Sequence, residues 1–477
     1  MTTLTESSFL RPDNRRLLAS VCVAMLALVA VPVLWSVQYV LLIAPTMVLT
    51  ALILFSVPRT LIAGTALTIL IPAQYYLQVR FPMDFRLAEA CLIAASLFAA
   101  IEITHRNGWQ LKRSAADRAV ALFLLAAILS AGVGYYYGNE TSLILRNLRF
   151  PLYYFAFYLF TQSVNSPVLA ARMFSTLAVL TGLAISVAFV LEFLEVIDLS
   201  GLGTDSFRVA RRQGIMLPIA LLLAINQFLH DPRRYGRLLP VAVLLVTGMA
   251  LSLTLARGMM VATIFGFTVA VWLRYREQHR AWRSLLMTVL ALAVLAGTAV
   301  MFQRVTGTAL TAHAVERSRT FVDYQSDVLF VSRLLGYGEA IELIKERPIL
   351  GSGQGTTLTS YTFDIDAKRF ERWTSWTLDS AYLTLWMKMG LPGLIAFGYL
   401  CFKIMSLSWY AFRHASDPRL KAFAASSVSI LAAFLVLGLS DGTMIGGRFA
   451  LLFAMLFGSV AVVARSIETP TLKGYGR

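Results

Sequence analysis

The stretch that decides the fold class is AVALFLLAAILSAGVGYYY, residues 119–137, in which no side chain is charged. A helix needs roughly 20 mainly apolar residues to cross a bilayer, so this stretch predicts a membrane-spanning helix. Similar runs recur along the 477 residues, of which 58% are hydrophobic and only 14% are charged. Soluble domains carry about 25% charged residues. The composition therefore predicts an integral membrane protein.

The apolar runs predict an all-α, polytopic fold with up to fourteen membrane-spanning helices. The runs at 148–164 and 214–229 are short and can be re-entrant or merged, which makes twelve the lower count. Continuous rather than alternating apolar runs argue against a β-barrel. The predicted spans are 17–35, 37–57, 60–79, 87–104, 119–137, 148–164, 168–196, 214–229, 238–255, 258–274, 284–302, 381–411, 421–440 and 448–464.

Basic residues in the short loops all fall on one side of the fourteen-span map, which predicts that this side is cytoplasmic. Both termini then lie inside, with the first helix uncleaved. The chain divides into membrane helices over 1–302, a large outer loop over 303–380 and C-terminal membrane helices over 381–477. The basic clusters are Arg11/Arg15/Arg16, Arg106/Lys112/Arg113/Arg118, Arg233/Arg234/Arg237, Arg274/Arg276/Arg280/Arg283 and Arg413/Arg419/Lys421.

The net charge of +16 does not predict a nucleic-acid partner. Topology and attraction to anionic lipid headgroups account for the basic inner loops, so the expected partner is the membrane. The cysteines Cys22, Cys91 and Cys401 are isolated within predicted spans. They are expected to be packing residues that face lipid or a neighbouring helix, with no disulfide or metal framework.

The outer loop is predicted to contain an amphipathic helix over 327–347, because its apolar residues recur at helical spacing. Pro348 ends that helix, and Gly351-Ser352-Gly353-Gln354-Gly355 is predicted to form a flexible turn. The glycines do not indicate a nucleotide site, since no phosphate-binding lysine follows them. Their backbone amides can still form an anion-binding nest.

Arginines on the predicted outer side are the first candidate functional residues. Outward arginine runs against the positive-inside rule, and arginine near lipid needs a partner. A guanidinium matches phosphate oxygens and stays charged when desolvated, so an anionic ligand is one explanation. Separate snorkelling to the headgroups is the alternative. The residues are Arg146, Arg149, Arg208, Arg211, Arg212, Arg257 and Arg448.

Asp379 lies at the outer mouth of the span that begins at 381, where the large loop returns to the membrane. Its carboxylate can accept a proton from a sugar hydroxyl. Capping of the following helix is an equally simple role, which aspartate and serine both favour. Glu339, in the predicted loop helix, is a second candidate base. Trp373, Trp376 and Trp386 can stack on sugars or anchor the protein at the interface.

Several segments resemble the O-antigen ligase and Wzy-type polymerase superfamily. The most specific are residues 332–355, which contain Ser332-Arg333 and Glu346-Arg-Pro-Ile-Leu-Gly-Ser-Gly-Gln-Gly, and residues 382–395. Residues 251–258 resemble the family's serine-arginine helix end, and Arg211-Arg212-Gln-Gly resembles another element, although Asn226 is displaced from the family spacing. The resemblance covers about residues 200–460.

This resemblance implies a glycosyltransferase of the bacterial inner membrane that faces the periplasm and needs no metal, cofactor or nucleotide sugar. The donor is an undecaprenyl-pyrophosphate-linked glycan, and arginines hold the pyrophosphate. The resemblance fits Arg257 and the group at 208–212, whereas Arg146, Arg149 and Arg448 match by position alone. Arg333, Ser380 and Tyr382 join the predicted substrate-binding residues.

Two acceptors are possible within this family. Polymerases extend another lipid-linked repeat, with a possible chain-length regulator as partner, and ligases transfer the glycan to lipid A–core. Where ligases have His-Asn, this chain has Asp379-Ser380, which favours a polymerase. A flippase for lipid-linked sugars is the alternative outside the enzyme class. Transporters place ionisable groups near mid-membrane, however, and here they gather at the outer ends of the helices.

Overall fold

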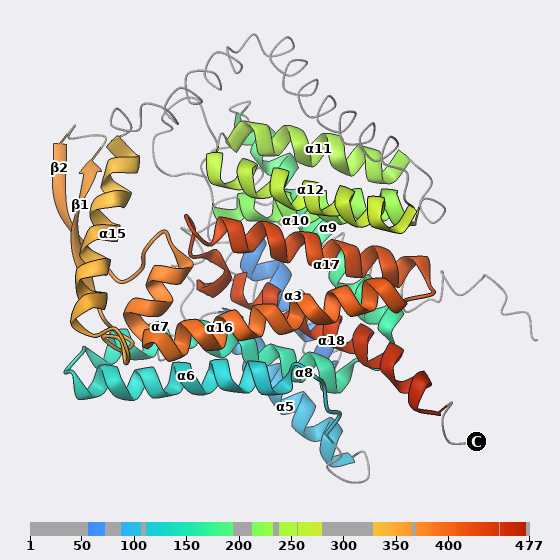
Figure 1. Ribbon diagram of the computed structural model, residues 1–477, viewed down its shortest axis with the longest axis horizontal. Helices are drawn as coiled ribbons and strands as arrows, with labels where there is room; N and C mark the ends of the chain where they lie inside the picture. The colour runs from blue at the N-terminus through green and yellow to red at the C-terminus, as the bar shows by residue number, and fades with distance from the viewer. Residues whose placement is uncertain are drawn as a thin grey trace, which may run out of the picture.

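The computed structural model describes residues 56–71, 87–105, 111–193, 212–231, 238–254, 256–278, 328–364, 369–447 and 449–473. These residues form a largely helical bundle with one β-hairpin (Figure 1). The bundle helices are α3 (Val57–Leu70), α5 (Leu87–His105), α6 (Asp117–Tyr136), α7 (Thr141–Leu152), α8 (Ala156–Ser163), α9 (Pro167–Phe193), α10 (Met216–His230), α11 (Leu238–Thr254), α12 (Arg257–Gln278), α16 (Ala381–His414), α17 (Pro418–Leu437) and α18 (Phe449–Lys473).

The expected polytopic membrane fold is confirmed. Within the described residues, α6, α9, α10, α12, α16, α17 and α18 are each long and apolar enough, with their adjoining turns, to cross a membrane. α3 and α11 are shorter apolar helices near predicted spans. The predicted spans at 17–35 and 284–302, and all but the end of 37–57, lie outside the described residues. The total of twelve to fourteen spans therefore stays a prediction.

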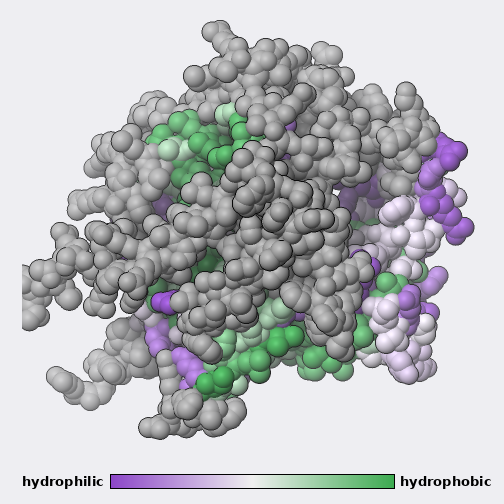
Figure 2. Space-filling model, turned by 180° about the vertical axis from the view of Figure 1, so that it is seen from behind, coloured by the Kyte–Doolittle hydropathy of each residue, from purple (hydrophilic) through white to green (hydrophobic). Residues whose placement is uncertain are grey.

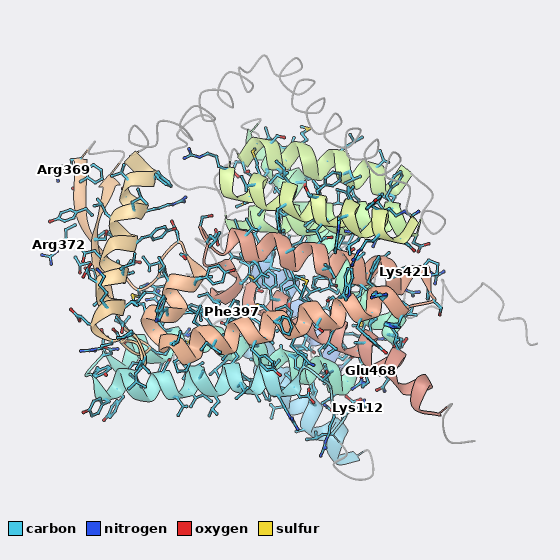
Figure 3. The ribbon with its side chains drawn as sticks, in the orientation of Figure 1. Lys112, Arg369, Arg372, Phe397, Lys421 and Glu468 are labelled. Atoms are coloured by element: carbon cyan, nitrogen blue, oxygen red, sulfur yellow. The ribbon has the colours of Figure 1, made fainter. Side chains whose placement is uncertain are left out.

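The two ends of the bundle carry the charges that the topology predicts. Arg369 and Arg372 lie at one end of the molecule and Lys112, Lys421 and Glu468 at the other (Figure 3). From behind, an apolar band along the lower edge has hydrophilic residues at both ends (Figure 2). The basic loop clusters that contain Lys112 and Lys421 thus share one end, as expected for a cytoplasmic face. The opposite end is called the outer end below.

The segment 148–164, predicted as one short span, does not form a single regular helix. α7 contains Pro151 and passes into the 3-10 turn η3 (Tyr153–Phe155), after which α8 begins. Proline within a helix removes a backbone donor and interrupts the hydrogen-bond ladder. This break explains why the apolar run is too short for one regular span, and it leaves α7 as a separate helix at the outer end (Figure 1).

Aromatic and small residues fill the core between the central helices. Phe123 of α6 packs against Tyr154 and against Phe397 of α16, with ring centroids 5.3 Å and 5.5 Å away. All three rings are buried. Cys91 and Cys401 are buried, which agrees with the helix-facing rather than the lipid-facing alternative, while Cys22 lies outside the described residues.

The outer loop contains the predicted helix and a hairpin that was not predicted. The helix, α15 (Val328–Glu346), ends one residue before Arg347. β1 (Leu358–Asp364) then pairs antiparallel with β2 (Arg369–Ser375). Alternating Thr359, Tyr361 and Phe363 favour a strand, a signal that the mixture of charges obscured. Leu358 anchors the hairpin, since it is buried with Ala340 of α15 and Met387 of α16.

The glycine segment is a buried docking element, which corrects the expected flexible turn. Gly351 (φ 69°) meets Gly390 (φ 64°), and a Cβ on Gly351 would lie 2.5 Å from the Gly390 nitrogen. The amide of Ser352 donates to the Met387 carbonyl at 2.7 Å, and that of Gln354 donates to the Ser130 carbonyl at 2.9 Å. Because these amides bond to protein carbonyls, they are not available for an anion nest.

Asn139, which follows α6, completes this docking. Its Nδ2 donates to the carbonyls of Ser352 and Gln354, both at 2.9 Å, and to Thr356 Oγ1 at 3.1 Å. On the other side, Trp386 Nε1 donates to the Pro348 carbonyl at 2.9 Å. The loop is therefore held between α6 and the kink of α16.

Gly390→Ala should lower the melting temperature and release the loop. Its positive φ costs an L-residue about 1–3 kcal/mol, and the added Cβ would lie 2.0 Å from the Ile349 carbonyl oxygen. Limited proteolysis should cut the 348–380 region faster in this variant. Gly398→Ala, also in α16, is the matched control because nothing lies within 4 Å of its added Cβ. Equal melting temperatures for the two variants would contradict the docking role.

Candidate active site

A pocket of about 400 Å³ opens at the outer end, where segments distant in sequence converge. Arg146 and Asn147 come from α7, and Trp376 to Asp379 come from the segment between β2 and α16. Lys388 comes from α16, and residues 441–447 come from the turn between α17 and α18. The outer loop supplies Gln354 and the Trp376–Asp379 segment, so it forms part of the pocket wall.

Lys388 is a buried lysine in the pocket wall. The residue is 5% exposed, and its Nζ donates to Asn147 Oδ1 at 2.9 Å and to the Trp376 carbonyl. In the described part of the chain, no carboxylate lies within ion-pair distance of this Nζ. Burying a charge without an opposite charge is costly. An anionic ligand beside Nζ would favour the charged form of this amine.

Asn147 also lines this pocket and has a side-chain donor without a partner among the described residues. Lys388 can only donate, so the atom that accepts from it is the Asn147 amide oxygen, which leaves Nδ2 on the other side. Asn147 is 3% exposed, and its Nδ2 has no hydrogen-bond partner among the described residues. An unsatisfied buried donor costs about 1–3 kcal/mol. A ligand oxygen would remove this cost.

Trp376 positions Arg146. The guanidinium of Arg146 lies 4.7 Å from the Trp376 ring centroid, and Phe150 stacks on the same tryptophan at 5.7 Å with an interplanar angle of 20°. Lys388 Nζ lies 5.7 Å from that centroid. Trp376 thus contacts Arg146, Lys388 and Phe150. These contacts indicate that its ring holds the Arg146 side chain in place rather than stacking on a sugar.

Asp379 lies at the rim of the pocket, bonded to the outer loop. Arg333 Nε of α15 donates to Asp379 Oδ2 at 2.9 Å, with both side chains about half exposed. Tyr337 donates through its hydroxyl to the Asp379 backbone carbonyl at 3.2 Å. Helix α16 is capped by Ser380, whose Oγ accepts from the Leu383 amide. The carboxylate of Asp379 is therefore not used as the cap.

Asp441 is a second carboxylate in the pocket wall, on the turn after α17. Its Oδ1 accepts from the Thr443 amide at 2.8 Å and from the Thr443 hydroxyl. Burial raises the pKa of Tyr337, the charges of Asp379 and Asp441 raise it further, and Arg333 opposes them. Tyr337 therefore stays a protonated donor beside this acidic rim.

Other predicted site residues have different partners. Arg149 forms an ion pair with Glu89 at 3.5 Å, so this arginine has an acid that sequence proximity did not reveal. Glu339 is exposed on α15 and does not line the pocket. The hydroxyl of Tyr382 donates to the Leu435 carbonyl at 2.6 Å. Neither Ser380 nor Tyr382 is among the residues of the pocket wall.

The remaining arginines are only partly described. Arg257 begins α12, and the adjacent Gly258 packs against Ser440, next to the Asp441 turn. Arg212 begins the 3-10 turn η4 (Arg212–Ile215), where a Cβ on Gly214 would meet Thr254 at 3.5 Å. The segments of Arg212 and Arg257 are thus neighbours. Arg208, Arg211, Arg448 and the side chain of Arg212 lie outside the described residues.

Sequence inspection missed Lys388, Asn147 and Asp441 as site residues. Lys388 had a signal, because it is an isolated charge within a predicted span, and such residues are functional candidates by default. Asn147 lies between Arg146 and Arg149, which were the stronger candidates for binding an anion. Asp441 lies in a short outer turn whose place beside α7 and α16 depends on the tertiary fold.

One family model matches part of the chain. No curated protein matches the chain. Residues 241–398 match the Wzy_C family model, which is described as O-antigen ligase. The matched region includes Trp376, Asp379 and Lys388. Proteins of this family are membrane enzymes of polysaccharide and O-antigen assembly. Residues 241–398 are therefore a Wzy_C O-antigen ligase family domain.

Proposed function

We propose that the protein is a metal-independent polysaccharide polymerase that works at the outer face of a bacterial inner membrane. Its substrates are glycan repeats linked to undecaprenyl pyrophosphate. The observation that carries this proposal is one pocket with a buried lysine, Lys388, an arginine beside it and a carboxylate at its rim. A lipid pyrophosphate needs the cations, and a sugar hydroxyl needs the base.

The proposed reaction is a single displacement at the anomeric carbon of the donor glycan. An acceptor hydroxyl forms the new glycosidic bond, and the bond to the pyrophosphate breaks with its electron pair on the leaving oxygen. Asp379 takes the hydroxyl proton. Its Oδ2 is held by Arg333, and its Oδ1 has no hydrogen-bond partner in the described residues, so it can accept this proton.

Arg146, Lys388 and the Nδ2 of Asn147 would stabilise the charge that develops on the pyrophosphate. Preorganised donors in a site with little water are among the largest contributions to catalysis. The neighbouring segments of Arg212 and Arg257 are proposed to extend this cationic surface, since Gly258 packs beside the turn that contains Asp441. The cations therefore lie inward and the proposed base lies at the rim.

The carrier tail is proposed to lie in an apolar groove of about 550 Å³ between α6 and α16. Leu125 and Leu129 of α6 face Ile395 of α16 across it, and all three are exposed. Met389 lines both this groove and the active-site pocket, so the two adjoin. A lipid could then reach the pocket sideways from the bilayer with its pyrophosphate leading.

An O-antigen ligase is the second candidate, because the matching family model carries that description. The same pocket would serve, with lipid A–core as the acceptor. Purified protein given carrier-linked repeats separates the two functions. Longer carrier-linked chains would support the polymerase. Transfer to lipid A–core without chain growth would establish the ligase and refute the polymerase.

Asp379→Asn should lower kcat by about 10²–10⁴-fold, because the amide cannot accept the proton. The assay is the rate of chain growth on purified carrier-linked repeats. Glu342→Gln is the matched control, since Glu342 is an exposed acid of α15 paired with Lys345 and lies outside the pocket. An Asp379→Asn protein that keeps the rate of the Glu342→Gln protein would remove Asp379 as the base.

Leu129→Trp should raise the KM for the long-tailed donor several-fold and leave kcat little changed, because the larger side chain fills the groove. A donor analogue with a short tail should bind equally well to the variant and the parent. Leu97→Trp is the control, because Leu97 is similarly exposed on α5 and does not line the groove. Equal KM values for the long-tailed donor in both variants would refute the proposed path.

A further inference from the structure

A second polar pocket, of about 300 Å³, lies at the end of the bundle opposite the active site. It is formed where α12 and α16 end and α17 begins, close to Lys421 (Figure 3). Arg276, Arg413 and Lys421 line it together with Glu277, Trp409 and Phe412. The proposed glycosyl transfer uses none of these residues.

The single acid of this pocket is already neutralised. Glu277 Oε2 is 2.9 Å from His230 Nδ1 and accepts from Arg274 Nη1 at 2.9 Å. Its Oε1 accepts from Lys421 Nζ at 2.9 Å. Arg276 and Arg413 have no carboxylate partner among the described residues. The pocket therefore carries a positive charge that the described side chains do not balance.

Aromatic rings hold one of these arginines in place. The Arg276 guanidinium lies 5.1 Å from the Trp272 ring centroid and 5.7 Å from that of Trp409. The two tryptophans stack at 5.5 Å with an interplanar angle of 22°. An arginine that only snorkels needs no such support. The stacked rings join α12 to α16 and preorganise the cation beside the pocket.

The position of the pocket along α16 matches the level of the lipid headgroups. From the kink at Gly390 to Phe412, α16 rises by about 33 Å at 1.5 Å per residue. That distance is close to the hydrocarbon thickness of a bilayer, about 30 Å. Tryptophans gather at membrane–water interfaces, and basic pockets between helices on the cytoplasmic side bind anionic headgroups. Trp272 is 45% exposed, so it can contact lipid.

We propose that this pocket binds the phosphodiester headgroup of an anionic glycerophospholipid from the leaflet opposite the active site. Arg276 and Arg413 donate to the phosphate oxygens beside the Lys421–Glu277 ion pair, and Trp272 and Trp409 pack against the glycerol and upper acyl chain. Guanidinium forks match phosphate oxygens in geometry and charge. The bound lipid links α12, α16 and α17. This proposal is independent of the glycosyltransferase function.

The test uses the full-length protein, purified and delipidated in a neutral detergent. Native mass spectrometry and melting temperature are followed as dioleoyl phosphatidylglycerol, dioleoyl phosphatidylcholine or inorganic phosphate is added. Phosphatidylglycerol should bind saturably and raise the melting temperature. The Arg276→Gln/Arg413→Gln protein should bind it at least about tenfold more weakly. Arg118→Gln, an exposed arginine at the cytoplasmic start of α6, should bind as the parent does.

Three outcomes would overturn the proposal. Phosphatidylcholine could bind as tightly as phosphatidylglycerol, the double variant could bind phosphatidylglycerol as tightly as the Arg118→Gln protein, or inorganic phosphate could give the same protection at the same concentration. Melting temperatures without added lipid show whether the double variant is folded. If it is not, the single variants Arg276→Gln and Arg413→Gln are measured, and unchanged affinity in both would refute the site.

Discussion

The close approach of two backbones at Gly351 and Gly390 is the constraint on which the outer end of the molecule depends. Neither position tolerates a Cβ, because each has a positive φ and the other backbone lies against it. The contact lets the turn after α15 sit in the kink of α16. Asp379 and Trp376 then return beside Lys388, which follows in the same helix. A loop that the sequence predicts to lie outside the membrane thereby forms one wall of the pocket.

The buried amine of Lys388 is a costly feature of the pocket wall. Lys388 is satisfied by an amide oxygen and a backbone carbonyl, which preserve its hydrogen bonds without neutralising its charge. A purely structural design would favour an apolar side chain at such a position. The unsatisfied Nδ2 of Asn147 next to it has the same character. Among the described residues, the pocket wall thus contains a lysine without a carboxylate partner and an amide donor without an acceptor. This is expected for a site that is complete only with its ligand.

Sequence patterns predicted the membrane fold well because hydrophobic length is a local property. The runs at 119–137 and 381–411 correspond to α6 and α16, and the predicted loop helix corresponds to α15. Long-range contacts were not accessible in the same way. Nothing local indicates that Arg149 meets Glu89 or that the glycine turn is buried against Ser130. The hairpin was missed because its alternation is short and β2 contains the charged residues Arg369, Glu371 and Arg372.

The matched family region contains only some of the residues that line the proposed active-site pocket. Residues 241–398 supply Trp376, Asp379 and Lys388, whereas Asn147, the partner of Lys388, and the Asp441 turn lie on either side of it. The pocket therefore combines residues of the matched region with residues from the helices and turns on either side of it. In the pocket, Asp379 and Lys388 lie beside residues from outside the matched region, and the identity of those residues can change independently of it. Exchange of the flanking helices would thus change part of the pocket wall while the matched region stays unchanged.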